Sequence, residues 1–543
     1  MPVRRGQGLP DIGSMASMQE GSYTQGSTPL GRRGLDAATA GAVFVCTALV
    51  LWWLFGQRLG ITYPKGTNDE GIYLDGARRI LAGQIPYRDF FAYLGPGAFW
   101  NTAAAFAVFG VTMEAAHVLL VADVALITAC LYWITAKLGG RTAALWLAAF
   151  YVADTASLRG TLGVNHRWDS GALLALAAAL LLYASLSGAR WAWTAAGALA
   201  AYAAWTTPSM ILVLPPMLGW AAYERRWTGG CLFASGVAGV SAAAAGVLAA
   251  QGALVPMARE MLWASANYSG ANRFPYGGVV GGYGGFFSGA RGVDFVVAGV
   301  VMGLFALQAL VPVVAAAGLV LSRQLRTARM WWLGACAVGA IAAAAPRMDV
   351  GHIAYSTTFA WVIAACALMR LPRLARTILS IALAAAIVLM AFGAIGVRAR
   401  LGKIESRVGT LYGDYDTLSL ARELEQAVAP GESFFAFPYL PYAYFLTQGK
   451  NPTRYSYLQP GMMTGREEAA ALAELRSAPP RKVLYFDWKP EFILWGWPST
   501  DPKRMRFKMI ESWLRANYTP DEQFSRAHPG GYQLLVWNEA HGR

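Results

Sequence analysis

Long apolar stretches separated by short polar segments dominate the chain between residues 37 and 396. Several of them continue for about eighteen residues or more with almost no charge, which is typical of transmembrane helices. The pattern predicts about eleven membrane-spanning helices. They lie at residues 37–59, 115–136, 142–157, 171–187, 191–207, 210–223, 228–251, 293–321, 330–345, 353–369 and 377–395.

The segment 96–110 is also apolar, but it is short for a span. If it does not cross, the basic clusters between the later spans share the side of Arg32 and Arg33, which is then cytoplasmic by the positive-inside rule. If it crossed, all of them would face outward. We therefore predict an interfacial or re-entrant helix on the outer leaflet. The clusters are Lys137/Arg141, Arg190, Arg225/Arg226, Arg323/Arg326/Arg329 and Arg370/Arg373/Arg376.

This topology divides the chain into three parts. Residues 1–36 are rich in Gly, Ser and Gln and are predicted to form a disordered cytoplasmic tail. Residues 37–396 form the transmembrane domain, with outer loops at 60–114 and 252–292. Residues 397–543 are polar and are predicted to form a small extracytoplasmic α/β domain, because helix-like stretches (LARELEQAV, REEAAALAELR, KMIESWLRANY) alternate with strand-like ones (SFFAF, KVLYF, YQLLVW).

Composition supports a membrane protein rather than a soluble or nucleic-acid-binding one. Hydrophobic residues make up 56% of the 543 residues, which is too apolar for a water-soluble fold. The net charge of +14 is distributed in short clusters between the apolar spans. No basic stripe with interleaved stacking aromatics is present in the sequence, so a nucleic-acid partner is excluded and the lipid bilayer is expected instead.

The most informative polar motif lies in the first outer loop. Thr67-Asn68-Asp69-Glu70 fits a capping box, with Thr67 as the cap. The helix that follows is predicted to be amphipathic, to lie on the membrane surface and to end at Gly83. Asp69 is then an ionised carboxylate in the first turn, suited to act as a general base. The alternative is that Asp69 and Glu70 only cap the helix. The apolar stripe comprises Tyr73, Ala77, Ile80 and Leu81.

From Asp69-Glu70, through ARRILAGQIPYRDFF and GPG, the first loop resembles bacterial GT-C glycosyltransferases, a group that includes protein mannosyltransferases and lipid A aminoarabinose transferases. The resemblance implies a polytopic helical fold whose first outer loop contains two surface-lying helices. It also implies a catalytic aspartate in that loop, here Asp69 with its neighbour Glu70. The implied donor is a polyprenyl-phosphate-linked sugar, and the implied location is the bacterial inner membrane.

Such a donor needs cations around its departing phosphate. Two outer turns offer them. Asn165-His166-Arg167-Trp168-Asp169 supplies His166 and Arg167, and Arg347-Met348-Asp349 followed by His352 supplies Arg347 and His352. Asp169 and Asp349 are candidates for contacts with the substrate. The alternative is that each arginine pairs with the aspartate of its own turn as an interfacial anchor.

Three other polar features are weaker. Arg88 is a further candidate for the donor phosphate and Asp89 for sugar hydroxyls, but a structural ion pair between them is favoured. The Gly-rich loop at 277–289, with Tyr283 as a candidate substrate contact, fits either a mobile cover or a passive linker. Asp414-Tyr415-Asp416 has the D-x-D spacing of some metal sites, but no metal or other cofactor is indicated, and a divalent cation is only an open option.

The sequence therefore predicts an inner-membrane glycosyltransferase, with a cytoplasmic N-terminus and an extracytoplasmic C-terminal domain. It would transfer a sugar from a polyprenyl-phosphate donor to a glycan, lipid or protein acceptor on the outer face. Two alternatives stay open: a transporter or flippase of lipid-linked sugars, and a non-catalytic membrane scaffold. Transporters commonly place their ionisable groups at the bilayer midplane between repeated halves, a pattern that this sequence lacks.

Overall fold

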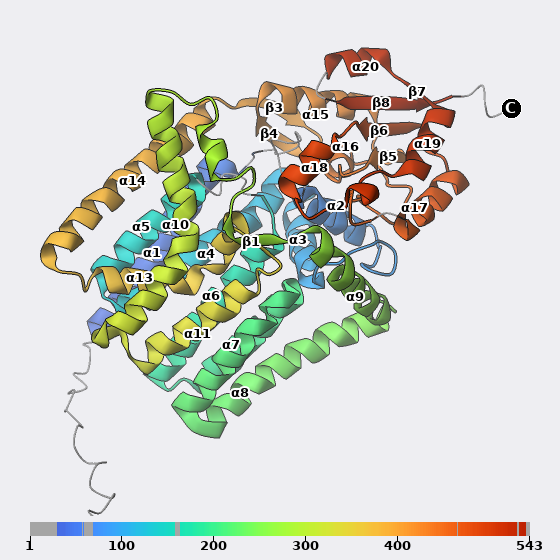
Figure 1. Ribbon diagram of the computed structural model, residues 1–543. Helices are drawn as coiled ribbons and strands as arrows, with labels where there is room; N and C mark the ends of the chain where they lie inside the picture. The colour runs from blue at the N-terminus through green and yellow to red at the C-terminus, as the bar shows by residue number, and fades with distance from the viewer. Residues whose placement is uncertain are drawn as a thin grey trace, which may run out of the picture.

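The computed structural model describes residues 30–56, 58, 69–157, 163–463, 465–528 and 531–538 (Figure 1). Most of the predicted disordered tail, residues 1–29, lies outside this range. For residues 30–36 the prediction is wrong, because helix α1 begins at Leu30 and continues to Phe55. The Asp36 carboxylate fixes the first turns of α1, since Lys137 Nζ and Arg141 Nε each donate to it at 2.6 Å.

Helices account for most of the described chain, and every segment predicted to span the membrane contains one. Among the described residues, six helical stretches are long and apolar enough to cross a bilayer, or seven if the pair α12–α13, bent by 77°, forms one span. The number eleven therefore stays a prediction. The helices of this part are α4 Met113–Leu138, α5 Arg141–Ser157, α6 His166–Ser187, α7 Arg190–Thr206, α8 Leu214–Ala250, α10 Val293–Leu321, α11 Ala328–Ala342, α12 Val350–Ser356, α13 Thr358–Leu368 and α14 Arg373–Ala399.

Helix α8 folds back on itself at Arg225 and Arg226, whose backbone angles are not helical. A Cβ atom at Gly229 would lie 2.3 Å from the carbonyl oxygen of Ala221, so the two arms contact each other directly after the turn. The two arms match the separate segments predicted at 210–223 and 228–251. The short 3-10 helix η2 (Pro208–Val213) leads into the first arm.

The first outer loop contains two helices, α2 (Asp69–Leu81) and α3 (Pro96–Phe109). Gly95 and Gly97 bring the start of α3 against the end of α7, where a Cβ atom at Gly95 would lie 2.2 Å from the carbonyl oxygen of Trp205. The predicted cap Thr67 lies outside the described residues. The helix at 96–110 is confirmed, whereas its depth in the membrane stays a prediction.

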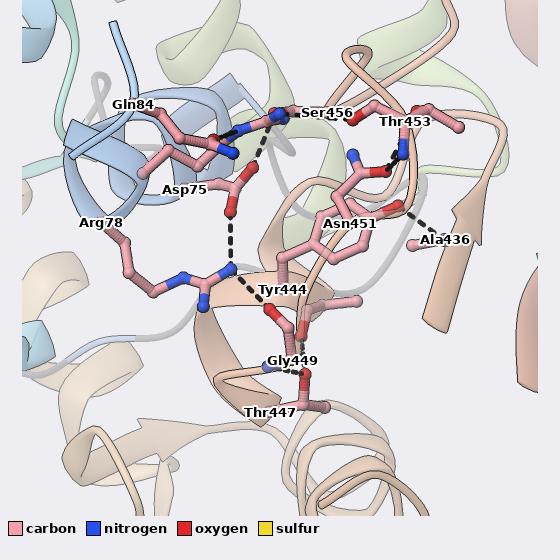
Figure 2. A network of polar contacts seen from close by, with 12 residues as sticks. Asp75, Arg78, Gln84, Ala436, Tyr444, Thr447, Gly449, Asn451, Thr453 and Ser456 are labelled. Carbon is pink, nitrogen blue, oxygen red and sulfur yellow. Dashed lines mark hydrogen bonds and ion pairs between the residues drawn. The ribbon is translucent and has the colours of Figure 1, made fainter. Parts of the chain in front are cut away.

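The polar face of α2 does not face water but is covered by another part of the chain, whereas the position of α2 at the membrane surface stays a prediction. Asp75 is completely buried and Arg79 is nearly so. Figure 2 shows why: Arg78 Nη2 donates to Asp75 at 3.0 Å and to the carbonyl of Gly449 at 2.6 Å, while Ser456 Oγ donates to Asp75 at 2.6 Å. A polar stripe in the sequence does not distinguish a hydrated face from one covered by a complementary polar segment.

The segment that covers α2 belongs to the region after α14. This region contains a hairpin of β3 and β4 and a four-stranded sheet of order β5-β6-β8-β7, in which only β5 and β6 are parallel. The predicted strands and helices are confirmed. Their bounds are β3 Gly402–Ser406, β4 Gly409–Gly413, α15 Tyr415–Ala427, β5 Phe434–Phe437, α16 Tyr442–Thr447, α17 Arg466–Ser477, β6 Lys482–Phe486, α18 Pro490–Gly496, η5 Pro502–Arg504, α19 Lys508–Asn517, β7 Tyr518–Pro520, α20 Glu522–Ala527 and β8 Tyr532–Trp537.

Between the helical part and this sheet lies a group of connecting elements (Figure 1). Helix α9 (Leu254–Ala271) follows α8, and strand β1 (Phe274–Gly278) pairs in parallel with β2 (Arg347–Asp349). The short helices η3 (Tyr283–Phe287) and η4 (Arg323–Leu325) flank α10. The pairing of β1 with β2 places the turn that bears Arg347 next to the end of α9.

Candidate functional site

A single cavity of about 930 Å³ lies where these parts meet. Its walls come from the start of α2, the turn before α6, helix α9, the β2–α12 turn and the C-terminal region. Seven of the sequence-predicted site residues line it together: Asp69, Glu70, His166, Arg167, Arg347, Asp349 and His352. A carboxylate from the first outer loop and cations from two distant outer turns therefore share one enclosed space.

Asp69 is exposed to this cavity and is held by the C-terminal region. Tyr439 Oη, from the turn after β5, donates to Asp69 Oδ1 at 2.6 Å. No other described residue hydrogen-bonds the Asp69 side chain, so Oδ2 is available to a ligand. Burial, followed by the charge of Asp69, raises the pKa of Tyr439 well above its usual value, so the tyrosine stays a neutral donor.

Glu70 also borders the cavity, but its carboxylate is buried and already engaged. Its Oε1 accepts from the backbone N–H of Val164 at 2.7 Å and lies 2.7 Å from His117 Nε2, while Tyr442 Oη donates to Oε2. His117 Nδ1 faces the carbonyl of Phe55 at 2.8 Å, so both ring nitrogens face acceptors. Because its lone pairs are occupied, Glu70 is placed to position its neighbours and not to exchange protons with a substrate.

Arg347 and His352 share the carboxylate of Asp349. Arg347 Nε donates to Asp349 at 2.5 Å, its Nη1 donates to Asn272 Oδ1 at 2.6 Å, and His352 Nδ1 lies 3.1 Å from Asp349 Oδ1. Burial raises the pKa of Asp349, but His352 and Arg347 outweigh it and hold the pKa below its usual range. Asp349 therefore acts as an anionic anchor that orients the Arg347 guanidinium and the His352 ring on the cavity wall.

In the second basic turn, which bears His166 and Arg167, the positive charge is less fully neutralised by neighbouring groups. The side chain of Asn165 caps α6 by accepting from the backbone N–H of Arg167 at 2.9 Å, which fixes the turn. His166 Nδ1 lies 2.7 Å from Thr207 Oγ1. Arg167 Nη1 is buried and has no hydrogen-bond partner among the described residues. An orphaned guanidinium nitrogen at a cavity wall is a ready contact for an anion.

Four other predicted site residues lie outside the cavity lining. Arg88 and Asp89 form an ion pair with two contacts of 2.9 Å, as the structural alternative proposed. Asp169 is buried and accepts from Asn101 Nδ2 at 2.8 Å, so it does not neutralise Arg167. Tyr283 donates to the carbonyl of Gly277 at 2.8 Å. Its loop nevertheless contributes Val279, Val280 and Phe286 to the lining.

The aromatic residues of the cavity were missed by sequence reasoning. Tyr93, Tyr268, Tyr439 and Trp497 are all half-buried and line the cavity from four separate segments. Tyr, Trp and Phe form 13% of the chain, so none of these positions stands out locally. Only the folded arrangement brings them to one wall.

No metal site is indicated in the part of the chain that the structure describes, where no group of three or more His, Cys, Asp or Glu side chains gathers. The D-x-D motif has a different role, because Asp414 caps α15 by accepting from the backbone N–H of Thr417 at 2.9 Å. Its spacing therefore reflects a helix start.

Comparison with solved structures identifies the class of fold. ArnT from Cupriavidus metallidurans bound to undecaprenyl phosphate is similar with a TM-score of 0.51 at 13% identity, over 91% of this chain and 97% of that one. The apo state of the same protein gives a TM-score of 0.51 at 13% identity, over 92% and 98%. The fold of this chain is thus similar to that of ArnT, and the apolar helices agree with a membrane protein.

An oligosaccharyltransferase from Archaeoglobus fulgidus, in complex with zinc and sulfate, is similar with a TM-score of 0.46 at 13% identity, over 81% of this chain and 67% of that one. This likeness is too weak to support an argument. No protein-family model matches the sequence, and comparison with curated proteins finds no match. The likeness to ArnT concerns the fold alone, so the chemistry has to be argued from the cavity.

Proposed function

We propose that this protein is a membrane glycosyltransferase that uses a polyprenyl-phosphate-linked sugar as donor. The observation that carries the proposal is the single cavity in which the Asp69 carboxylate shares space with Arg347, His352 and Arg167. Transfer of a glycosyl group needs both functions: a base for the acceptor and positive charge for the leaving phosphate.

In the proposed reaction, Asp69 Oδ2 removes the proton from an acceptor hydroxyl while Tyr439 holds Oδ1. The acceptor oxygen forms a bond to the anomeric carbon, and the bond from that carbon to the phosphate oxygen breaks. A single displacement inverts the configuration at this carbon. The polyprenyl phosphate leaves with the electron pair, and the negative charge that develops on it is stabilised by the guanidinium groups.

The lipid part of the donor would lie along the apolar section of the cavity wall. Phe286 and Phe305 line this section, and their ring centroids are 5.3 Å apart. These residues come from η3 and α10, the latter being one of the helices long enough to cross a membrane. With the topology predicted from the sequence, the donor phosphate would then lie at the outer surface of the bilayer, on the same side as the first outer loop and the C-terminal region.

The donor site can be tested by replacing its cations one at a time. Arg347→Ala and Arg167→Ala are each expected to weaken the binding of undecaprenyl phosphate by about tenfold or more, since each removes a charge-assisted contact. Binding to the purified protein in nanodiscs is measured by native mass spectrometry. Arg323→Ala, an exposed arginine outside the cavity lining, is the matched control and is expected to bind like wild type.

Equal binding by all three variants would show that the donor does not bind in this cavity.

Cleavage of the donor separates the proposal from the transporter alternative. A transferase releases polyprenyl phosphate, whereas a flippase moves the sugar-linked lipid intact. Release of polyprenyl phosphate by wild-type protein, lost in Arg347→Ala, is therefore the expected result.

A further inference from the structure

The charges of the cavity are divided between its walls. Every basic residue among the described lining positions lies at the start of α6 or in the β2–α12 turn. The described lining residues of α9 and of the C-terminal region are all uncharged, and those of the first outer loop add only Asp69 and Glu70. Positive charge is thus concentrated where the donor phosphate is proposed to bind.

Another part of the cavity wall is aromatic. Tyr93 from the first outer loop lies against Tyr268 from α9, with ring centroids 5.8 Å apart. Tyr268 in turn meets the edge of Trp497, which follows α18, at 6.2 Å. All three side chains are half-buried and border the cavity, so parts of their rings are free to contact a ligand.

This aromatic wall lies next to Asp69. Burial, followed by Tyr268 and then by the charge of Asp69, raises the pKa of Tyr93. Burial also raises the pKa of Tyr268, against the charges of Arg167 and Arg347 and together with that of Asp69. Both hydroxyls therefore stay protonated and neutral at physiological pH. The buried amide of Gln459 adds a further uncharged polar group to the same side of the cavity.

We infer that the acceptor is an uncharged carbohydrate, bound on the wall of Tyr93, Tyr268 and Trp497 with one hydroxyl directed at Asp69. A sugar ring presents an apolar face of C–H groups and a rim of hydroxyls, which match aromatic faces bordered by neutral donors and acceptors. A phosphate or carboxylate on the acceptor would instead bring a second negative charge next to Asp69, and it would compete with the donor phosphate for Arg167 and Arg347.

The inference rests on the proposed function in one respect, which is that the bound glycan is called an acceptor. Its test needs neither a donor nor catalytic turnover. Labelled full-length protein in nanodiscs is applied to an array of uncharged, phosphorylated and uronic-acid glycans and of hydroxyl-bearing peptides. Binding is expected to be restricted to uncharged glycans. Titration with the strongest glycan is then expected to show about tenfold weaker binding for Tyr93→Ala and for Trp497→Ala.

Two controls keep the result interpretable. Trp497→Phe keeps an aromatic ring and is expected to bind within about threefold of wild type. Tyr415→Ala removes a tyrosine that is 84% exposed and lies outside the cavity lining, so it is expected to bind like wild type. Thermal unfolding of each variant verifies that it is folded.

Binding confined to charged glycans or to peptides, absence of glycan binding, or unchanged binding by Tyr93→Ala and Trp497→Ala would overturn the inference. These failures differ from failure of the proposed function. If the protein binds uncharged glycans but cleaves no polyprenyl-phosphate sugar, the proposed transferase function is wrong and the glycan-binding site stands. If the protein transfers the sugar to a phosphorylated or peptide acceptor, the proposed class of acceptor is wrong and the proposed transferase function stands.

Discussion

Two adjacent carboxylates have different surroundings, and this difference assigns their roles. Asp69 is exposed to the cavity and accepts one hydrogen bond from Tyr439. Glu70 is buried, and its carboxylate contacts His117 of α4, the backbone of Val164 and Tyr442 of α16. A general base has to reach the proton that it removes. Of the two, only Asp69 has a free oxygen at the cavity.

A third carboxylate, Glu260 in α9, connects the first outer loop to the C-terminal region. It accepts from the backbone N–H of Ala92 at 2.8 Å and pairs with Arg454. Burial raises the pKa of Glu260 to about 7, although Ala92 and Arg454 lower it. Because the folded state holds this proton more tightly, the contribution of Glu260 to stability is fully present below about pH 4.5 and is lost as the pH rises through about 7.

We therefore expect Glu260→Gln to flatten the fall in unfolding temperature between pH 5 and pH 8, by on the order of 2 °C. Glutamine keeps the acceptor for Ala92 and Arg454 but does not titrate. The measurement is intrinsic fluorescence during heating of the protein in nanodiscs. Glu522→Gln, at a side chain that is 84% exposed, is the control and should leave the slope unchanged. An identical slope in wild type and Glu260→Gln would contradict the prediction.

The charged residues of the site could be predicted from the sequence, and its aromatic residues could not. Asp69, Arg167, Arg347 and His352 stand next to long apolar stretches, where a charge is costly unless it has a role. Arg88 satisfies the same criterion and is nonetheless a structural partner of Asp89. Tyr439 is distinguished only by its contact with Asp69, 370 residues away.

At the scale of elements, the contact between α2 and α16 joins the loop that bears Asp69 to the C-terminal region. Gly71 makes this contact possible, because a Cβ atom there would lie 2.4 Å from the backbone nitrogen of Tyr442 and 2.9 Å from the carbonyl carbon of Pro441. Both obstacles are backbone atoms, which do not move aside as a flexible side chain can. The start of α2, with Asp69 and Glu70, is thereby fixed against the segment that supplies Tyr439 and Tyr442.

We expect Gly71→Ala to destabilise the protein by about 2 kcal/mol, as overpacking does, and to lower transfer activity because Asp69 shifts away from Tyr439. Unfolding temperature and activity are compared with those of Gly41→Ala. Gly41 lies within α1 with no atom near its added Cβ, so the control is expected to be neutral or slightly stabilised. Equal stability of the two variants would show that α2 and α16 do not need this close approach.

The helices and strands themselves follow from local pattern. Apolar length predicts the helices of the membrane part, and the strand-like stretches SFFAF, KVLYF and YQLLVW predict β5, β6 and β8. The burial of the polar face of α2 could not be predicted, because Arg78 and Asp75 find their partners in Gly449 and Ser456, which are more than 370 residues away. A helix with a polar stripe has the same sequence pattern whether water or another segment covers it.

At the scale of the whole molecule, the site exists only through assembly of distant parts. The apolar helices hold the two basic turns, the first loop contributes Asp69, and the C-terminal region closes the cavity with Tyr439 and Trp497. This arrangement is consistent with the predicted topology, in which all of these segments share the outer face. The number of crossings and the sidedness stay predictions.

The most direct test of the account is the reaction of Asp69→Asn with polyprenyl-phosphate sugars. Radiolabelled donors are incubated with wild-type and variant protein in nanodiscs, and both donor binding and release of polyprenyl phosphate in the presence of acceptor are measured. The account predicts that the variant binds donor within about threefold of wild type but releases polyprenyl phosphate at least about a hundredfold more slowly. Release at the wild-type rate by Asp69→Asn would contradict it.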